Sequence, residues 1–102
     1  MKRTFAAIVQ RTSKWDQSKP APEQDGFAAH AKYMHDLEAE GFITLAGLMQ
    51  DTFDVLFILK ADSKEQVDAR LAADPWRQDG HTRLTRLEEL VMRPDPPKPA
   101  GA

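Results

Sequence analysis

The chain has 102 residues, of which 41% are hydrophobic and 29% charged, so we expect one globular domain with its own core. Fourteen Lys and Arg residues against 16 Asp and Glu residues give a net charge of −2, and no basic block is present that could neutralise a run of phosphates. A nucleic-acid partner is therefore not expected. The absence of cysteine excludes disulfides, thiolate metal ligands and cysteine nucleophiles.

The N-terminal segment predicts a buried strand. Residues 4–10 (TFAAIVQ) place apolar side chains on both faces, as a strand covered on both sides requires. The apolar run after Lys2 and Arg3 is too short for a signal peptide, and no run in the chain is long enough to span a bilayer. We therefore expect a cytoplasmic protein with no membrane partner.

The next part of the chain predicts a loop, a helix and two strands. The loop over residues 12–26 is polar and contains proline, and it leads into a helix over 23–40. Gly41 follows where a left-handed helix cap is expected. Strands are then predicted at 42–49 and 53–61, separated by a turn at Gln50 and Asp51.

The last third of the chain predicts a second helix and a final strand. Ser63 opens the helix, with Gln66 in the position of a capping box, and Asp74-Pro75 ends it, because the residue before proline is driven out of the helical region. Residues 81–92 predict a last strand with an irregularity near Arg86. We expect a domain over 1–93 and a disordered proline-rich tail over 94–102.

The predicted order is strand, helix, strand, strand, helix, strand. This is the α+β, ferredoxin-like βαββαβ arrangement, in which an antiparallel four-stranded sheet carries two helices on one face. The first and third strands are central in that topology and apolar on both faces, so something else must cover the second face. We expect the same face of another subunit, giving a homodimer with two packed sheets; the alternative is a monomer with that face exposed to water.

The predicted first helix carries an unusual polar residue in its apolar stripe. At about 100° per residue, Phe27, Met34 and Leu37 lie on one face, and His30 falls among them, toward the sheet. One interpretation is a buried histidine whose ring bonds a backbone carbonyl and has no chemical task. The other requires a second group that orients and charges the ring. A metal site is not expected, because His35 and Asp36 point to different helix faces and no third ligand has suitable spacing.

Four short motifs in this order resemble the YCII-related (YciI-like) family over about residues 3–94 of the chain. The motifs are His30 at the start of an apolar helical segment, Gly41 at its end, Ala46-Gly47 after the next strand begins, and Asp74-Pro75-Trp76 with Gly80 beyond it. The family is similar to dimeric α+β barrels, so the resemblance implies the same split fold and the same sheet-to-sheet dimer. It also implies an active site built on a histidine and an aspartate, here His30 and Asp74.

The chain departs from the family pattern in three places. Leu48 replaces the proline of the usual Ala-Gly-Pro, the loop with Trp15 carries no family motif, and the segment from Gly80 to Arg93 is longer than the usual last strand. These departures affect the identity of the substrate more than they affect the expected fold. The alternative role for Asp74 is that of a local helix stop before proline.

Two classes of function fit these residues. The first is a small-molecule enzyme in which His30 acts as general base or acid and Asp74 orients it, with Tyr33, Trp76 and Gly47 lining the substrate pocket. Proton transfer, elimination or isomerisation on a small carbonyl or aromatic compound suits such a pair, with no cofactor. Oxygenation without a cofactor is a third possibility that rests on fold similarity. The second class is a module that binds a small ligand, or assembles with other proteins, without catalysis.

Overall fold

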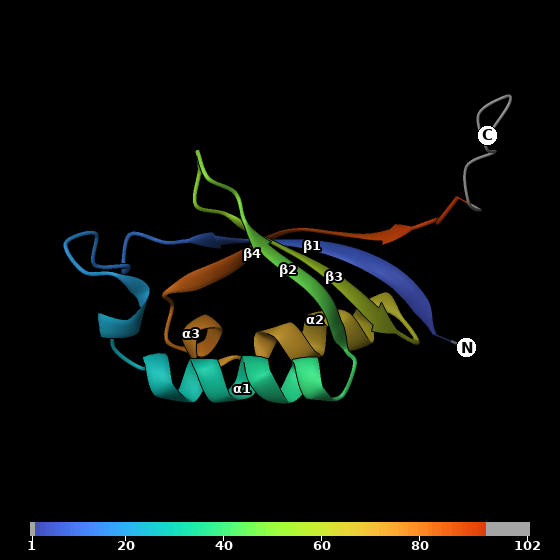
Figure 1. Ribbon diagram of the computed structural model, residues 1–102, viewed down its shortest axis with the longest axis horizontal. Helices are drawn as coiled ribbons and strands as arrows, with labels where there is room; N and C mark the ends of the chain where they lie inside the picture. Colours follow the sequence, from blue (N-terminus) through green and yellow to red (C-terminus); the bar gives the residue numbers. More distant parts are fainter. Residues whose placement is uncertain (1, 94–102) are drawn as a thin grey trace, which may run out of the picture.

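The computed structural model describes residues 2–93, and Figure 1 shows its arrangement. The elements are, in chain order, β1 (Arg3–Arg11), the 3-10 helix η1 (Ala21–Glu23), α1 (Phe27–Ala39), β2 (Ile43–Leu48), β3 (Val55–Ala61), α2 (Lys64–Ala72), α3 (Pro75–Gln78) and β4 (Thr82–Leu90). The predicted tail over 94–102 lies outside the described residues. None of the helices in the described part of the chain is long and apolar enough to cross a membrane.

The four strands form one antiparallel sheet with the order β2-β3-β1-β4. This is the ferredoxin-like arrangement predicted from the element order, with β1 and β3 in the centre. Strand β1 pairs with β3 from Arg3 opposite Ala61 to Val9 opposite Val55. The fold class is therefore confirmed.

The helices lie on one side of the sheet, as Figure 1 shows for α1, α2 and α3. Because side chains alternate across a strand, every second residue of β1 and β3 points at the helices, and Phe5 and Leu59 are fully buried there. Leu37 of α1 and Val67 of α2 are fully buried against them. The core thus fills the layer between the sheet and the helices, and the site described below lies at one end of it.

Helix α1 begins at Phe27, four residues later than predicted. Gly26 has a φ of 80°, a left-handed conformation that separates η1 from α1. The predicted end is confirmed: Gly41 has a φ of 79°, its N–H bonds the carbonyl of Glu38, and the Phe42 N–H bonds the carbonyl of Leu37. These two bonds form a Schellman motif, which satisfies carbonyls that the helix end would leave unpaired.

The turn between β2 and β3 is longer than predicted. Phe53 has a φ of 61° and donates its N–H to the carbonyl of Met49, while the Met49 N–H donates to the carbonyl of Asp54. Phe53 therefore belongs to the turn, and β3 begins at Val55. The sequence pattern included Phe53 in the strand because it is apolar; a side chain in the left-handed region cannot continue a pleated strand.

The predicted start of α2 is confirmed. The Ser63 hydroxyl accepts from the Gln66 N–H at 3.1 Å, as a capping residue does. The Gln66 side chain accepts from the N–H of Asp62 rather than from that of Ser63, one residue before the expected position. The helix ends before Asp74-Pro75, but these two residues also begin α3, a short helix that the sequence analysis missed.

The irregularity predicted near Arg86 is a bulge in β4. Ile8 of β1 lies opposite Arg86, whereas Val9 lies opposite Leu84, so Thr85 is the extra residue. The Thr85 hydroxyl donates to the carbonyl of Ile8 at 3.1 Å. A bulge of this kind changes which face the flanking residues occupy, which explains why strict alternation failed in this segment.

Candidate active site

His30 and Asp74 are in direct contact. The Nδ1 atom of His30 lies 2.8 Å from Oδ1 and 3.0 Å from Oδ2 of Asp74, although the two residues are 44 positions apart. The side chains are 19% and 9% exposed, so the pair is largely shielded from water. An ionised carboxylate carries no proton, so in this contact Nδ1 donates and the carboxylate accepts. This leaves Nε2 as the ring nitrogen with no hydrogen-bond partner among residues 2–93.

Asp74 is fixed by its place at the start of α3. It is the N-cap residue of that helix, and its Oδ1 accepts from the N–H of Trp76 at 3.1 Å. Pro75 stands at the first helical position, where its missing N–H costs nothing. The two alternatives for Asp74, a local backbone cap and a partner of His30, are therefore both true of the same carboxylate.

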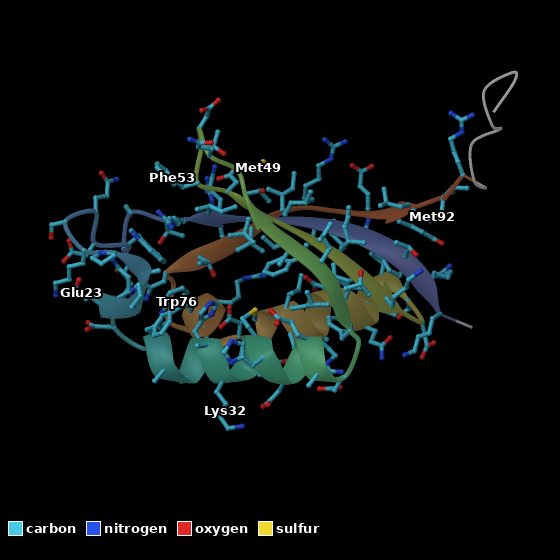
Figure 2. All side chains as sticks on the ribbon, viewed as in Figure 1. Glu23, Lys32, Met49, Phe53, Trp76 and Met92 are labelled. Atoms are coloured by element: carbon cyan, nitrogen blue, oxygen red, sulfur yellow. The ribbon has the colours of Figure 1, made fainter. Side chains whose placement is uncertain are left out.

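Trp76 stacks on one face of the His30 imidazole. Its ring lies 3.8 Å from that of His30, measured between centroids, with the planes 15° from parallel. The indole N–H donates to the carbonyl of Asp25 at 2.8 Å, which ties the ring to the end of the preceding loop. Figure 2 shows Trp76 between α3 and the beginning of α1. One tripeptide, Asp74-Pro75-Trp76, thus supplies both the carboxylate and the aromatic plane that orient His30.

A second histidine and aspartate pair lies beside Trp76. His81 is buried, its Nδ1 lies 2.6 Å from Oδ1 of Asp79, and its ring centroid is 5.9 Å from that of Trp76. Burial acts to raise the pKa of Asp79, but the hydrogen bonds from the ring and backbone N–H of His81, with the charge of Lys14, outweigh it and lower that pKa. This pair is outside the pocket described next and packs behind the site.

A pocket of about 340 Å³ lies between the helices and one end of the sheet. Both His30 and Asp74 line it, and most of its wall is apolar. Its size is at the low end of the range of small-molecule sites. The residues that line it are Val9, Arg11, Trp15, Ala21, Phe27, His30, Met34, Glu38, Ala46, Leu48, Val55, Phe57, Leu71, Asp74, Trp76, Arg77 and Thr82.

The loop after β1 contributes Trp15 to this pocket. Trp15 is buried and packs edge-on against Trp76, with ring centroids 5.0 Å apart. The loop is held by the buried side chain of Gln24, which donates to the carbonyls of Asp16 and Lys19 and accepts from the N–H of Asp16. The sequence does not determine the course of this loop, but an apolar ring within an otherwise polar segment is the signal that makes Trp15 a candidate for the pocket.

Two of the three residues predicted for the pocket wall, Tyr33 and Gly47, are not among its lining residues. The Tyr33 hydroxyl donates to the carbonyl of Arg70 at 2.8 Å, between α1 and α2, and Tyr33 is not among the lining residues of the described pocket. Gly47 is also not among them, although its neighbours Ala46 and Leu48 are. Trp76 does line the pocket. Arg11, Arg77 and Thr82 line it as well and were not predicted.

The charged side chains of the site do not form a metal centre. Within residues 2–93 no group of three or more His, Asp or Glu side chains is close enough to hold a metal ion.

One of the comparisons with known proteins gives a family for this chain. The family model of the YCII-related domain matches residues 5–90, which include β2, β3, β4 and the three α-helices in full and all but the first two residues of β1. A comparison with curated proteins gives no match. On the strength of the family match, the chain belongs to the YCII-related domain family.

Proposed function

We propose that the protein is an enzyme that transfers a proton to or from a small carbonyl or aromatic compound, with His30 as the general base and acid. The observation that carries this proposal is the contact between His30 Nδ1 and Asp74 in a pocket that both residues line. A base of this kind must have one nitrogen oriented and the other free to meet the substrate. The arrangement of His30 fits both requirements.

The chemistry follows from the two ring nitrogens. Nε2 of His30 accepts a proton from a carbon next to a carbonyl group, and the carboxylate of Asp74 stabilises the imidazolium that forms. The face of Trp76, stacked on the ring, adds to this stabilisation by a cation–π interaction. Return of the proton at a different carbon gives isomerisation, and departure of a leaving group gives elimination. Asp74 and Trp76 act as positioning residues in this scheme.

The pocket also suits a module that binds a small ligand without catalysis, whereas pure assembly with other proteins requires no such cavity. A binding module needs His30 as a hydrogen-bond donor, and Gln supplies one. An enzyme needs a side chain that changes its protonation state, and Gln cannot. His30→Gln therefore separates the two functions.

The test needs no knowledge of the natural substrate. A panel of small cyclic and aromatic ketones, lactones and acids is incubated with the protein in D2O, and loss of the proton signals next to the carbonyl group is followed by NMR. We expect exchange with the parent protein and none above background with His30→Gln. Exchange at the same rate with both proteins contradicts the proposal, as does a panel without any exchange.

We also propose that the working form is a homodimer joined through the sheet face that the helices leave open. Cross-strand pairing puts Ala6 beside Ile58 and Ile8 beside Leu56 on this face, and Leu45, which lies opposite Ile58 from β2, is 63% exposed. A row of apolar side chains across three strands favours association with an identical face by a twofold axis. The pocket of each subunit would then lie on the far side of its own sheet.

A further inference from the structure

Two residues that line the pocket each have a buried polar atom without a partner among residues 2–93. Among the described residues, Nη1 of Arg77 and the hydroxyl oxygen of Thr82 are buried and make no hydrogen bond. Both residues line the pocket that contains His30 and Asp74. They come from different elements, since Arg77 lies in α3 and Thr82 begins β4.

An unsatisfied buried donor is costly, and more so when it carries charge. A buried polar group without a hydrogen bond loses the interactions it had with water and gains nothing in return. Most such groups in folded proteins have partners, so two at one pocket require a reason. Arg77 is also in no ion pair within residues 2–93. A ligand whose entry turns these two groups toward the cavity would supply the partner that both atoms lack.

The two atoms define what that partner must offer. A guanidinium group only donates, and the hydroxyl of Thr82 can donate, so the ligand must present acceptors. A carboxylate has two oxygens, carries the charge that matches Arg77, and forms strong charge-assisted hydrogen bonds with guanidinium groups.

The other charged residues that line the pocket do not neutralise the charge of Arg77. Asp74 is already bonded to His30 and to the Trp76 N–H, and Glu38 is exposed on α1. Arg11 lies with its guanidinium carbon 4.1 Å from the ring centroid of Trp15, a cation–π contact. Arg77 is therefore the lining cation with a buried donor and no contact to satisfy it.

The other residues that line the pocket favour a ligand that is mostly apolar. Side chains such as Phe27, Met34, Val55 and Phe57 surround the cavity, and its volume of about 340 Å³ accommodates a compound of about one ring. From these observations we infer that the pocket takes a small carboxylic acid with an apolar or aromatic body, whose carboxylate is bound by Arg77 and Thr82. The inference rests on the proposed function only in taking this pocket as the substrate site.

The test compares an acid with its neutral amide. Binding of phenylacetate and of phenylacetamide is followed by the NMR signals of the indole N–H groups of Trp15 and Trp76, two residues that line the pocket. The parent protein should bind the acid about tenfold more tightly than the amide, the effect of one charge-assisted hydrogen bond. Arg77→Met should remove this preference, and Thr82→Val should weaken binding of the acid severalfold. Lys32→Gln, which removes an exposed charge that points away from the sheet (Figure 2), should change neither.

Thermal unfolding adds a readout that a structural role cannot reproduce. Because the two polar atoms are unsatisfied without ligand, Arg77→Met and Thr82→Val should unfold at the same temperature as the parent protein or higher. Equal binding of acid and amide by the parent, no detectable binding of the acid at millimolar concentration, or an unchanged preference in Arg77→Met would each overturn the inference.

The outcome of this binding test can be distinguished from the outcome of the proton-exchange assay. Binding of phenylacetate does not require proton transfer, and its dependence on Arg77 should persist in His30→Gln. A protein that shows this dependence but exchanges no protons contradicts the proposed function and supports the acid site. A protein that exchanges protons but binds the acid and the amide equally supports the proposed function and contradicts the acid site.

Discussion

Trp76 stacks on His30 with the ring centroids 3.8 Å apart, and the backbone N–H of the same tryptophan donates to the carboxylate that His30 contacts. The position of the imidazole and that of its partner are therefore set by one residue. A histidine on a helix is free to adopt several rotamers, but this ring is held at its face and at Nδ1 at once. The orientation of Nε2 is thus a consequence of the short helix α3.

Replacement of Trp76 by phenylalanine tests this role. The smaller ring can still stack on His30, but the hydrogen bond from the indole to the carbonyl of Asp25 is lost and a gap remains in the packing around Trp15. We expect the free energy of unfolding to fall by about 2 kcal/mol. Urea denaturation at neutral pH measures the loss. An unchanged midpoint would mean that the indole does not fasten the loop to the site.

Replacement of Asp74 by asparagine or alanine separates its two roles. Asparagine can cap α3 by accepting from the Trp76 N–H, so Asp74→Asn should lose little stability, whereas Asp74→Ala should lose about 1 kcal/mol with the cap. Proton exchange should fall in both, by about 100-fold or more, because neither side chain carries the charge that stabilises the imidazolium. Equal activity of the parent protein and Asp74→Asn would show that the charge has no role.

The pH dependence of stability reports on Asp79. Its pKa in the folded protein lies below the ordinary value of 3.8, so the charged form is favoured by folding. The resulting stabilisation is complete above about pH 4 and is lost as the pH falls through the lower, folded-state pKa. Asp79→Asn should therefore be less stable than the parent protein at pH 7, and the difference should shrink below pH 4.

The size of this effect is limited by exposure. The side chain of Asp79 is 35% exposed, so water screens its interaction with His81, and we expect a difference of about 1 kcal/mol at pH 7. Urea denaturation at a series of pH values measures it. A difference between the two proteins that stays constant down to pH 3 would exclude this source of stability.

A charged residue on the open face of the sheet should prevent dimerisation. Ile58→Lys places an ammonium group beside Ala6 and Leu45 at the centre of this face, against the same residues of a second copy. Glu88, opposite Ala6 on β4, is already paired with Arg86. The parent protein should sediment as a dimer and the variant as a monomer, since an unpaired buried charge costs several kcal/mol. Lys32→Gln, on the helix side, is the matched control and should remain dimeric. A monomeric parent protein at micromolar concentration would refute the dimer.

Much of the fold could be predicted because it rests on local patterns. Apolar residues on both faces of β1 and β3 indicated central strands, and Ser63 with Gln66 marked the start of α2. The missed features depend on backbone conformations that residue type does not determine. Gly26 and Phe53 both lie in the left-handed region, which shortened α1 and β3 relative to the prediction. The helix α3 was missed because Asp74-Pro75 was interpreted as the end of one helix and is also the beginning of another.

The site was predictable only in part. His30 is conspicuous because it interrupts an apolar stripe, but Asp74 is 44 residues away, and only the family resemblance connected the two. Trp15, Arg77 and Thr82 reach the pocket through tertiary contacts, such as those of Gln24 in the loop after β1. Tyr33 was expected at the pocket because it lies near the edge of the same helix face, yet its hydroxyl turns to Arg70.

The proposed reaction requires that Asp74 hold His30 with Nδ1 protonated and Nε2 free to accept a proton. The measurement that tests it most directly is 15N NMR of the imidazole ring, at a pH high enough for the ring to be neutral, in the parent protein and in Asp74→Ala. We expect that in the parent protein the ring proton resides on Nδ1 and that this preference is lost in the variant. A proton on Nε2 in the parent protein would place a nitrogen lone pair against a carboxylate, and it would contradict the assignment of His30 as a base oriented by Asp74.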